Sequence, residues 1–501
     1  MATNEITFEA AGLTFNVPNG LFLGGSWREG SSGEKLSVFD AATGKTIAEV
    51  ASATEEDAAE ALDIAAKVQP EWGATAPRER SEILRKFYEL IIEHTDELTV
   101  LQSLELGRAM PDSKGEVAYG AEYFRWFSER AAAITGEFRQ APAGNGRIAT
   151  THRPVGPVLA ITPWNFPLAM VARKLAPALA AGCTMIAKPA QLTPLTMLYM
   201  AKLGQEAGIP DGVFQVLPTT SAKRISTLLE DDRIRKLTFT GSTSVGQALT
   251  AKAAEKTIRT SLELGGNAPF VVLSHADLDK SVEQAVAAKM RGAGQVCIAA
   301  NRFIIHEDLA DEFETKITEK LKTFVMGPGT DEKTTQGPMV SEDQRQKVID
   351  LVKQAVDGGA KVLLGGNEAL DNLSETHPEL DPNGFWYPAT VLTNVTPDNP
   401  IANEEIFGPV VAIQRVSSDE EALKVANDTP FGLAAYVMGE DMKATMQFAE
   451  KIEAGMVGVN RGAISDAAAP FGGVKQSGLG REGGFEGIEE YLDTVYLALD
   501  F

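Results

Sequence analysis

The chain has 501 residues, 44% hydrophobic and 23% charged, a composition typical of a globular protein with about two to four domains. Its net charge of −23 argues against a nucleic-acid partner, because binding to a phosphate backbone requires clustered positive charge. No apolar run is long enough to span a bilayer, and the first residues lack the basic and apolar regions of a secretory signal. We therefore expect no membrane partner.

Cysteine and histidine usage points to a reducing compartment and to chemistry without a metal. Cys183 and Cys297 are the only cysteines, which excludes a disulfide framework and favours a cytoplasmic location. The five histidines include no pair at i, i+4, so a helix-borne zinc site is not expected. We expect no metal in the functional site.

The first third of the chain predicts short strands followed by helices. Residues 1–55 carry β-prone runs broken by glycine, and the helical pattern extends from Thr54 to about Ala133. Thr54 and the three acidic residues after it are suited to the start of a helix. A Pro/Gly-rich linker is predicted between Gln140 and Gly146.

From residue 158 the pattern alternates between strand and helix. The predicted strands are 158–161, 184–187, 213–217 and 236–240, and the predicted helices are 168–181, 195–207 and 221–230. Such repeated units predict a parallel, doubly wound sheet, which the pair Gly265-Gly266 closes. A second α/β series runs from about 268 to 438, with helices near 277–291, 308–322 and 341–357, and the tail 491–499 is again β-prone.

Cys297 is the leading candidate for a catalytic nucleophile. It lies among glycine, glutamine and small residues and not in an apolar packing stripe. A thiolate can form a covalent intermediate, and Glu263, which precedes a Gly-Gly pair, could activate water against it. Judged by itself, a small buried cysteine with a packing role is an equally good interpretation.

Three further segments lie where strands of a doubly wound sheet end, which is where such sheets bind ligands. Asn165 follows the first strand between two prolines, and its amide could donate to an oxyanion or only to a structural turn. Lys188 ends the next strand, where it could reach ribose or phosphate or lie in solvent. Gly241 and Ser242 start a helix whose backbone amides could bind phosphate.

Taken in order, these motifs resemble the NAD(P)-dependent aldehyde dehydrogenases over nearly the whole chain. The motifs are Trp164-Asn165-Phe166-Pro167, Lys188-Pro189-Ala190, Phe239-Thr240-Gly241-Ser242, Glu263-Leu264-Gly265-Gly266, Gly294-Gln295-Val296-Cys297, Glu404-Glu405-Ile406-Phe407-Gly408-Pro409 and Pro470-Phe471-Gly472-Gly473. The resemblance implies Cys297 as nucleophile, Asn165 as oxyanion donor and Glu263 as general base. It also implies that the cofactor contacts Trp164, Lys188, Pro189, Ala190, Gln191, Gly241, Ser242, Val245, Leu264, Glu405 and Phe407.

The same resemblance implies an α/β architecture in three parts. Residues 1–137 and 154–267 would form a doubly wound cofactor-binding domain, and residues 268–460 an α/β catalytic domain. Residues 138–153 and 485–501 would form a β extension for oligomerisation, which implies a homo-oligomer, either a dimer or a tetramer.

The substrate expectation depends on Arg173, Arg291 and Ser465. These match positions that bind the substrate carboxylate in succinate-semialdehyde dehydrogenases, and arginine binds carboxylate through two parallel hydrogen bonds. The expected reaction is oxidation of succinate semialdehyde to succinate with NAD(P), through a cysteine thioester. The alternatives are aromatic or longer semialdehydes, and an inactive member with a structural or binding role.

Two departures from the family pattern affect the cofactor and its regulation. Gln191 replaces a glutamate that many members carry, which removes a charge that would repel a 2′-phosphate. NADP or NAD is therefore expected, with NADP slightly favoured. Ala299 stands where some succinate-semialdehyde enzymes carry a second cysteine, so Cys297 cannot form a disulfide with that neighbour.

Overall fold

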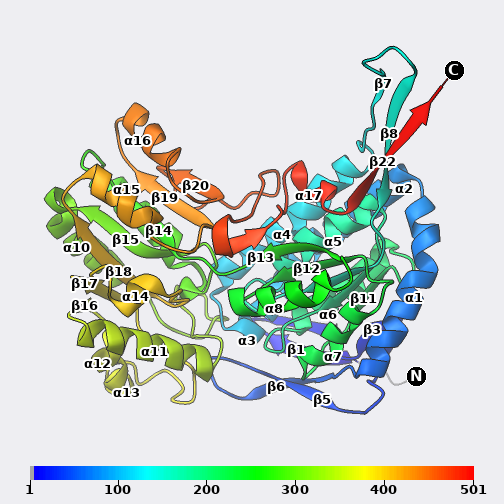
Figure 1. The fold of residues 1–501 in the computed structure, drawn as a ribbon. Helices are drawn as coiled ribbons and strands as arrows, with labels where there is room; N and C mark the ends of the chain where they lie inside the picture. The colour runs from blue at the N-terminus through cyan, green and yellow to red at the C-terminus, as the bar shows by residue number, and fades with distance from the viewer. Residues whose placement is uncertain (1–4, 501) are drawn as a thin grey trace.

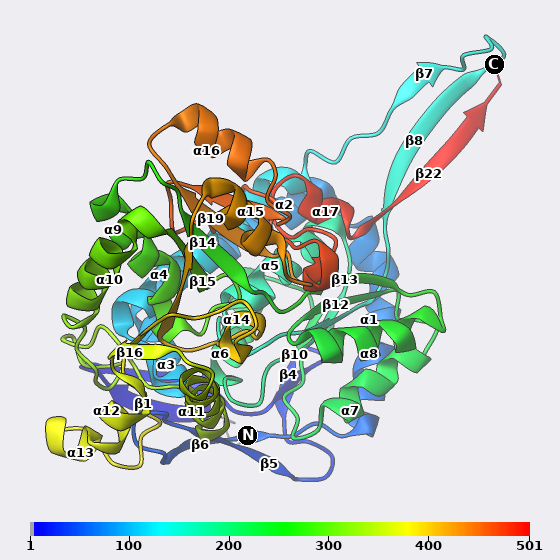
Figure 2. The same ribbon diagram turned by 60° about the vertical axis from the view of Figure 1, so that its left-hand side comes forward.

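The computed structural model describes residues 5–500 and arranges them in two lobes, each built on a mostly parallel sheet. A slender three-stranded arm stands away from both lobes (Figures 1 and 2). Residues 1–4 and 501, which the sequence assigned to the first domain and the last strand, lie outside the described residues.

The first sheet has eight strands in the order β21-β13-β12-β9-β10-β11-β3-β4. The strands are β3 (Leu21–Leu23), β4 (Ser26–Arg28), β9 (Val158–Ile161), β10 (Met185–Lys188), β11 (Phe214–Val216), β12 (Lys236–Thr240), β13 (Arg259–Glu263) and β21 (Gly478–Leu479). The five central strands are parallel; four of them were predicted, β13 is the fifth, and the sequence pattern made no prediction for the two edges. There β3 pairs antiparallel with β11 and with β4, and β21 pairs antiparallel with β13. Both edges come from chain segments outside the repeated units.

The second sheet has seven strands in the order β16-β17-β18-β15-β14-β19-β20. The strands are β14 (Ala268–Val272), β15 (Ala300–His306), β16 (Lys361–Leu364), β17 (Thr390–Thr393), β18 (Val410–Val416), β19 (Ala434–Met438) and β20 (Met456–Val459). Only β16 runs antiparallel to its neighbour. The chain crosses from one sheet to the other through Gly265 and Gly266, between β13 and β14.

The predicted helical stretch from Thr54 contains four helices. They are α1 (Glu55–Ala74), α2 (Pro77–Glu93), α3 (Thr95–Leu106) and α4 (Met110–Ala131). Thr54 caps α1 as predicted, since its hydroxyl accepts from the Asp57 N–H while the Asp57 carboxylate accepts from the Thr54 N–H.

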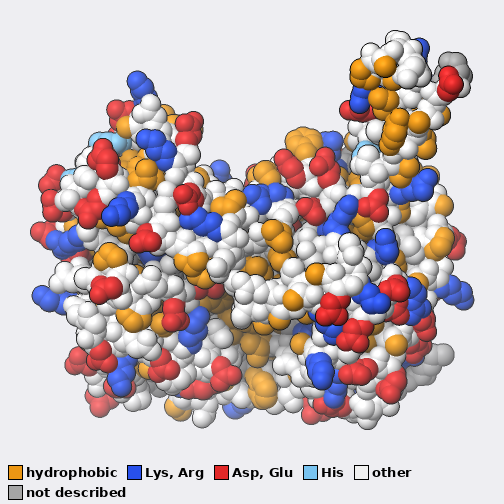
Figure 3. Space-filling model, in the orientation of Figure 1, with side chains coloured by type: hydrophobic (Ala, Val, Ile, Leu, Met, Phe, Trp, Pro, Cys, Tyr) orange, Lys and Arg blue, Asp and Glu red, His pale blue; other side chains and the backbone are white. Residues whose placement is uncertain are grey.

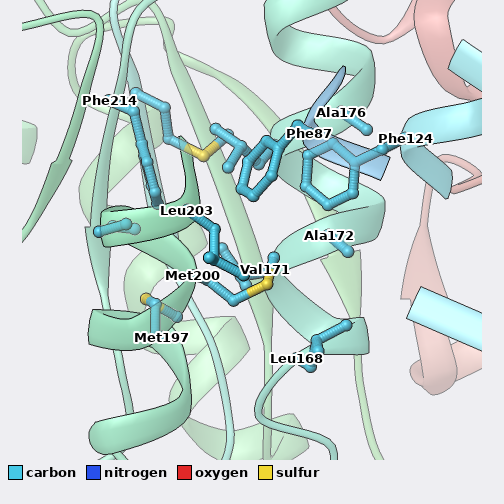
Figure 4. Packing of buried hydrophobic residues seen from close by; sticks show 14 of the residues in the cluster. Phe87, Phe124, Leu168, Val171, Ala172, Ala176, Met197, Met200, Leu203 and Phe214 are labelled. Atoms are coloured by element: carbon cyan, nitrogen blue, oxygen red, sulfur yellow. The ribbon is translucent and has the colours of Figure 1, made fainter. Parts of the chain in front are cut away.

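The helices of the first sheet include one that is buried on every side. They are α5 (Ala169–Ala181), α6 (Leu195–Ala207), α7 (Ala222–Ser226) and α8 (Thr243–Ala254). All thirteen residues of α5 are buried, because α2, α4 and the strands β9 and β10 pack against it. Figure 4 shows this core, in which Phe87 of α2 and Phe124 of α4 lie with ring centroids 4.2 Å apart. The start of α5, just after Asn165, is therefore held in the core.

The second lobe carries the remaining helices. They are α9 (Leu278–Lys289), α10 (Glu307–Leu321), α11 (Glu342–Asp357), α12 (Gly366–Asp371), α13 (Leu373–Thr376), α14 (Pro400–Asn403), α15 (Asp419–Asn427) and α16 (Met442–Ala449). The last helix, α17 (Glu486–Glu489), packs instead against α5 of the first lobe and β22 of the arm. The predictions for α9, α10 and α11 agree with these bounds within two residues. None of the described helices combines the length and apolarity needed to cross a bilayer.

The arm consists of β7 (Phe138–Gln140), β8 (Arg147–Pro154) and β22 (Leu492–Leu499), all antiparallel. The predicted linker at 140–146 is instead the turn of a hairpin, since Ala141 N–H donates to the Gly146 carbonyl at 3.0 Å. Phe138 and Tyr496 are 63% and 61% exposed, so the arm presents apolar surface to solvent. Two further hairpins, β1 (Glu5–Ala10) with β2 (Leu13–Pro18) and β5 (Lys35–Phe39) with β6 (Thr46–Ala51), complete the fold.

Candidate active site

A cavity of about 230 Å³ lies between the two lobes and is lined by residues from both. Figure 3 shows the surface hollowed along the line where the lobes meet. Eight of the residues predicted from the sequence line it, namely Trp164, Asn165, Gly241, Ser242, Leu264, Cys297, Glu405 and Phe407. The carboxyl ends of β9, β12 and β13 therefore meet the segment around Cys297, although 130 residues separate Asn165 from Gln295 in sequence.

The backbone before Cys297 forms an unusually tight turn. Gly292, Ala293 and Gly294 have consecutive φ angles of 56°, 54° and 74°, in the left-handed region that alanine adopts only at a cost. A Cβ at position 294 would lie 2.2 Å from the Gly408 carbonyl oxygen, so only glycine fits there. This turn leaves Cys297 half-buried at the cavity wall.

Gln295 links this turn by hydrogen bonds to the segment that contains Pro338 and Val340. Its side-chain oxygen accepts from Val340 N–H at 3.0 Å, and its Nε2 donates to the carbonyls of Gly292 and Pro338 at 3.2 and 3.4 Å. The Gln295 carbonyl accepts from Nδ2 of Asn165 at 3.1 Å. The proposed oxyanion donor is thus bonded to the turn that carries the proposed nucleophile.

The Cys297 thiol lies in a desolvated setting with charged groups of both signs nearby. Burial raises its pKa to about 11, Glu405 and Glu263 act in the same direction, and the guanidinium groups of Arg173 and Arg291 act in the opposite one. At neutral pH the resting side chain is therefore mainly the thiol.

Glu263 ends β13 and its carboxyl group is buried. Its Oε2 has no hydrogen-bond partner among residues 5–500, and burial together with the charge of Glu482 raises its pKa well above the usual range. Glu482 itself forms ion pairs with Arg173 and Lys174, and these cations lower its pKa although burial opposes them. Both effects favour the protonated form of the Glu263 carboxyl group.

The three predicted substrate residues differ in how free their side chains are to bind a substrate. Arg173 is fully buried, ion-paired with Glu482, and its guanidinium lies 4.1 Å from the Phe471 ring centroid. Arg291 is half-buried, and its Nε finds no hydrogen-bond partner in the described part of the chain. Ser465 is half-buried in the loop after β20. Arg173 therefore already has a carboxylate partner inside the protein, in a buried position and not on a helix surface.

The predicted cofactor residues fall into two groups. Glu405 accepts from the Gly266 N–H at 3.2 Å, and burial raises its pKa to about 7. Phe407 has a φ of 55°, and its ring meets that of Trp164 edge-on at 5.3 Å. These residues line the cavity, whereas Lys188, Pro189, Ala190, Gln191 and Val245 lie beyond its walls.

Outside the cavity, the second group could hold the far end of a dinucleotide. Lys188 is buried and donates only to the Pro189 carbonyl, at 3.0 Å, and burial lowers its pKa to about 8. The N-terminus of α8 has no side-chain cap, so the backbone N–H groups after Ser242 are free to bind phosphate. Both features fit a nucleotide cofactor.

Two cavity residues had no signal in the sequence. Gln344 and Lys347 come from α11, whose pattern indicated only an amphipathic helix. The Lys347 ammonium donates to the Glu405 carbonyl at 2.7 Å and so supports the segment that carries this predicted cofactor contact. No group of three or more His, Cys, Asp or Glu side chains suited to a metal ion occurs within residues 5–500.

With this geometry in place, comparison with known proteins defines the class. The model of the aldehyde dehydrogenase family matches residues 27–496, and the chain belongs to that family. It is therefore an oxidoreductase that acts on aldehydes, in a family that uses NAD(P).

Several relatives carry names that refer to semialdehyde substrates. The chain is 49% identical to the succinate-semialdehyde dehydrogenase of Paenarthrobacter nicotinovorans, over 90% of this chain and 98% of that protein. It is 39% identical to the succinate-semialdehyde dehydrogenase [NADP(+)] GabD of Escherichia coli, over 95% and 97%. It is 41% identical to a glutarate-semialdehyde dehydrogenase of Pseudomonas putida, over 95% and 97%.

A solved structure of a relative has the same fold. The crystal structure of succinate-semialdehyde dehydrogenase from Burkholderia pseudomallei superposes with a TM-score of 0.93 at 41% identity, covering 97% of this chain and 98% of that one. The aldehyde-dehydrogenase fold expected from the sequence is confirmed.

Proposed function

We propose that this protein oxidises succinate semialdehyde to succinate, with Cys297 as nucleophile and NADP or NAD as hydride acceptor. The observation that carries the proposal is that Cys297, Asn165 and several predicted cofactor contacts line the same cavity, with Arg291 near the thiol. The names of the relatives support the same substrate. A non-enzymatic role has no support among them.

The first half of the reaction follows from the contacts of Cys297 and Asn165. The Cys297 thiol first loses its proton to solvent, since only the thiolate, its minor form at neutral pH, is nucleophilic. The thiolate then attacks the aldehyde carbon, a carbon–sulfur bond forms, and the carbonyl electrons move onto oxygen. The Asn165 amide and the Cys297 backbone N–H stabilise that alkoxide. NAD(P), when bound, accepts the hydride that leaves this carbon.

The second half depends on Glu263. Loss of the hydride leaves a thioester on Cys297, and water must attack it. Glu263 takes a proton from that water in its carboxylate form, the carbon–sulfur bond breaks, and the acid is released. The raised pKa of Glu263 makes this step faster at higher pH.

For the substrate carboxylate, we propose Arg291 as the main anchor. Arg291→Ala should lower kcat/KM for succinate semialdehyde by about 2–4 kcal/mol, roughly 30- to 1,000-fold, because a charge-assisted pair is lost. Activity on acetaldehyde should change far less, since that substrate has no carboxylate. Arg173→Ala should lower both activities alike, because it leaves Glu482 with one cation fewer.

Steady-state kinetics on both aldehydes, with Arg291→Lys as the matched control, checks this prediction. Arg291→Lys keeps the charge but not the two-point geometry, so it should fall between wild type and Arg291→Ala. Equal losses on the two aldehydes for Arg291→Ala would rule out the anchor. Glutarate semialdehyde belongs in the same panel, because a higher kcat/KM for it would favour the longer substrate.

For the cofactor, we propose that NADP is accepted because position 191 carries no charge. Gln191 is exposed, and its amide donates to the Thr220 carbonyl. Arg224, which is ion-paired with Glu34 at 2.6 Å, also contacts the Thr220 hydroxyl at 3.3 Å, so a cation lies close by.

Gln191→Glu should shift the NADP/NAD ratio of kcat/KM toward NAD by about tenfold, through repulsion of the 2′-phosphate. Kinetics with both cofactors measures the ratio. Gln191→Ala is the control, because it removes the amide without adding charge and should move the ratio much less. A constant ratio in Gln191→Glu would show that this position does not select the cofactor.

We also propose that the arm joins copies of this chain into a homo-oligomer, since it exposes Phe138 and Tyr496 on an otherwise unsupported sheet. Sedimentation of the wild-type protein tests this, and a monomer would contradict it. A cytoplasmic location is proposed from the two unpaired cysteines.

A further inference from the structure

The corner between α3 and α4 does not line the cavity, yet it contacts both catalytic segments. Arg108 lies in the loop between these helices, and Asp112 and Glu116 lie in the first two turns of α4. No sequence motif singles out any of the three. Their contacts reach the Asn165 turn on one side and the Cys297 turn on the other.

Arg108 is buried and its guanidinium is held from several directions. Nη1 donates to the Asn165 backbone carbonyl at 3.2 Å, and Nη2 donates to Gln102 Oε1 at 2.8 Å and pairs with Glu116. The guanidinium also lies 4.8 Å from the ring centroid of Phe166, the residue after Asn165. A planar group with this many partners has little freedom, so the Asn165 backbone is fixed in turn.

Glu116 fixes the chain just after Asn165. Its Oε1 accepts from the N–H groups of Leu168 and Ala169 at 2.8 and 3.0 Å, where α5 begins without a side-chain cap of its own. The same carboxylate pairs with Arg108 through Oε2. One buried ion pair therefore holds both sides of the Asn165 turn.

Asp112 fixes the chain before Cys297. Its Oδ2 accepts from the Gly292 N–H at 2.8 Å, where the left-handed turn begins. From Gly292 a chain of hydrogen bonds returns to the starting point, since Gln295 Nε2 donates to the Gly292 carbonyl and Asn165 Nδ2 donates to the Gln295 carbonyl. Arg108 and Asp112 thus hold the two ends of one closed network.

We propose that Arg108 and Asp112 are positioning residues that set the distance between the Asn165 amide and the Cys297 sulfur. The inference rests on the proposed roles of Asn165 and Cys297. A displacement of about 1 Å in such a pair costs on the order of 100-fold in rate, although neither Arg108 nor Asp112 touches the substrate.

The test uses 4-nitrophenyl acetate, which acylates a cysteine and releases nitrophenolate through a tetrahedral oxyanion, without cofactor or carboxylate. Asn165→Ala should slow acylation by about 100-fold or more, and Arg108→Gln by about 10- to 100-fold. If Arg108 acts through Asn165, the double variant should be no more than about threefold slower than Asn165→Ala.

Alkylation by iodoacetamide separates positioning from damage to the nucleophile. This reaction forms no oxyanion, so Arg108→Gln should alkylate within about threefold of wild type. Arg80→Gln is the matched structural control, because Arg80 is also buried and donates to a backbone carbonyl, that of Ala180, at 3.1 Å. Any loss that it causes should multiply fully with Asn165→Ala.

Asp112 supplies a second, independent test if Arg108→Gln does not fold. Asp112→Ala should slow acylation by about tenfold, and Asp112→Asn should recover most of that loss, because an amide oxygen can accept the same Gly292 N–H. Equal acylation rates in Asp112→Ala and wild type would overturn the role of Asp112.

The possible outcomes distinguish a failure of this proposal from a failure of the proposed function. If Arg108→Gln and Asn165→Ala multiply to the full product of their losses, the positioning role of Arg108 is wrong while the oxyanion role stands. If Asn165→Ala acylates like wild type, the oxyanion role fails and the positioning proposal fails with it. Neither result depends on which aldehyde or cofactor the enzyme uses.

Discussion

Replacing Cys297 with Ala is expected to abolish NAD(P) reduction with every aldehyde, a loss of at least about 10⁴-fold, because no other group can form the thioester. Absorbance of the reduced nicotinamide measures the rate, and circular dichroism shows whether the variant is folded. Retained activity would remove Cys297 from the role of nucleophile.

Cys183→Ala is the matched control for that experiment. Cys183 is the only other cysteine, is fully buried, and donates to the Tyr491 carbonyl at 3.4 Å, far from the chemistry. Its replacement should leave kcat within about twofold of wild type.

The pH dependence of alkylation tests the ionisation of Cys297. Alkylation of wild type should accelerate about tenfold per pH unit between pH 8 and 10, because the pKa of the Cys297 thiol is about 11 and the thiolate is the reactive form.

Glu263→Gln should give a burst of about one reduced cofactor per active site, followed by turnover about 10²- to 10⁴-fold slower than wild type. The thioester still forms, but water loses its base. Stopped-flow absorbance resolves the burst from the slow phase. A steady state without a burst, at the wild-type rate, would exclude Glu263 from deacylation.

The pH profile gives that prediction a second readout. Burial and Glu482 raise the pKa of Glu263, so the carboxylate form gains population as pH rises, and wild-type kcat should rise with it. The Glu263→Gln variant should lack this rise. Glu105→Gln, which neutralises another buried carboxyl group, should keep the rise and show no burst.

Local sequence patterns predicted the helices and the parallel strands because those elements depend on nearby residues. The alternation of strand and helix after residue 158 and the cap at Thr54 are examples. The antiparallel edges escaped prediction because β21 is two residues long and pairs with a strand more than two hundred residues earlier. Such a pairing leaves no periodicity to detect.

In the candidate site too, local motifs were predicted and contacts between distant segments were not. The motifs predicted which loops meet at the cavity, but ion pairs between distant segments could not be read from them. Lys174 and Glu482 are 308 positions apart, and the neighbouring Arg173 shares that carboxylate, which changes what Arg173 is free to bind. Arg108 and Asp112 escaped prediction because the groups that they hold in the two catalytic segments are backbone groups, which any sequence provides.

The complete burial of α5 bears on how this enzyme can be engineered. Because none of its thirteen residues faces solvent, a mutational scan should find polar substitutions depleted at every position from 169 to 181, without the tolerant stripe of an ordinary surface helix. Libraries that aim to change substrate choice should leave this helix intact. Libraries can instead vary Arg291 and the Ser465 loop, which are less buried. Such changes leave α5, which supports the Asn165 turn, unchanged.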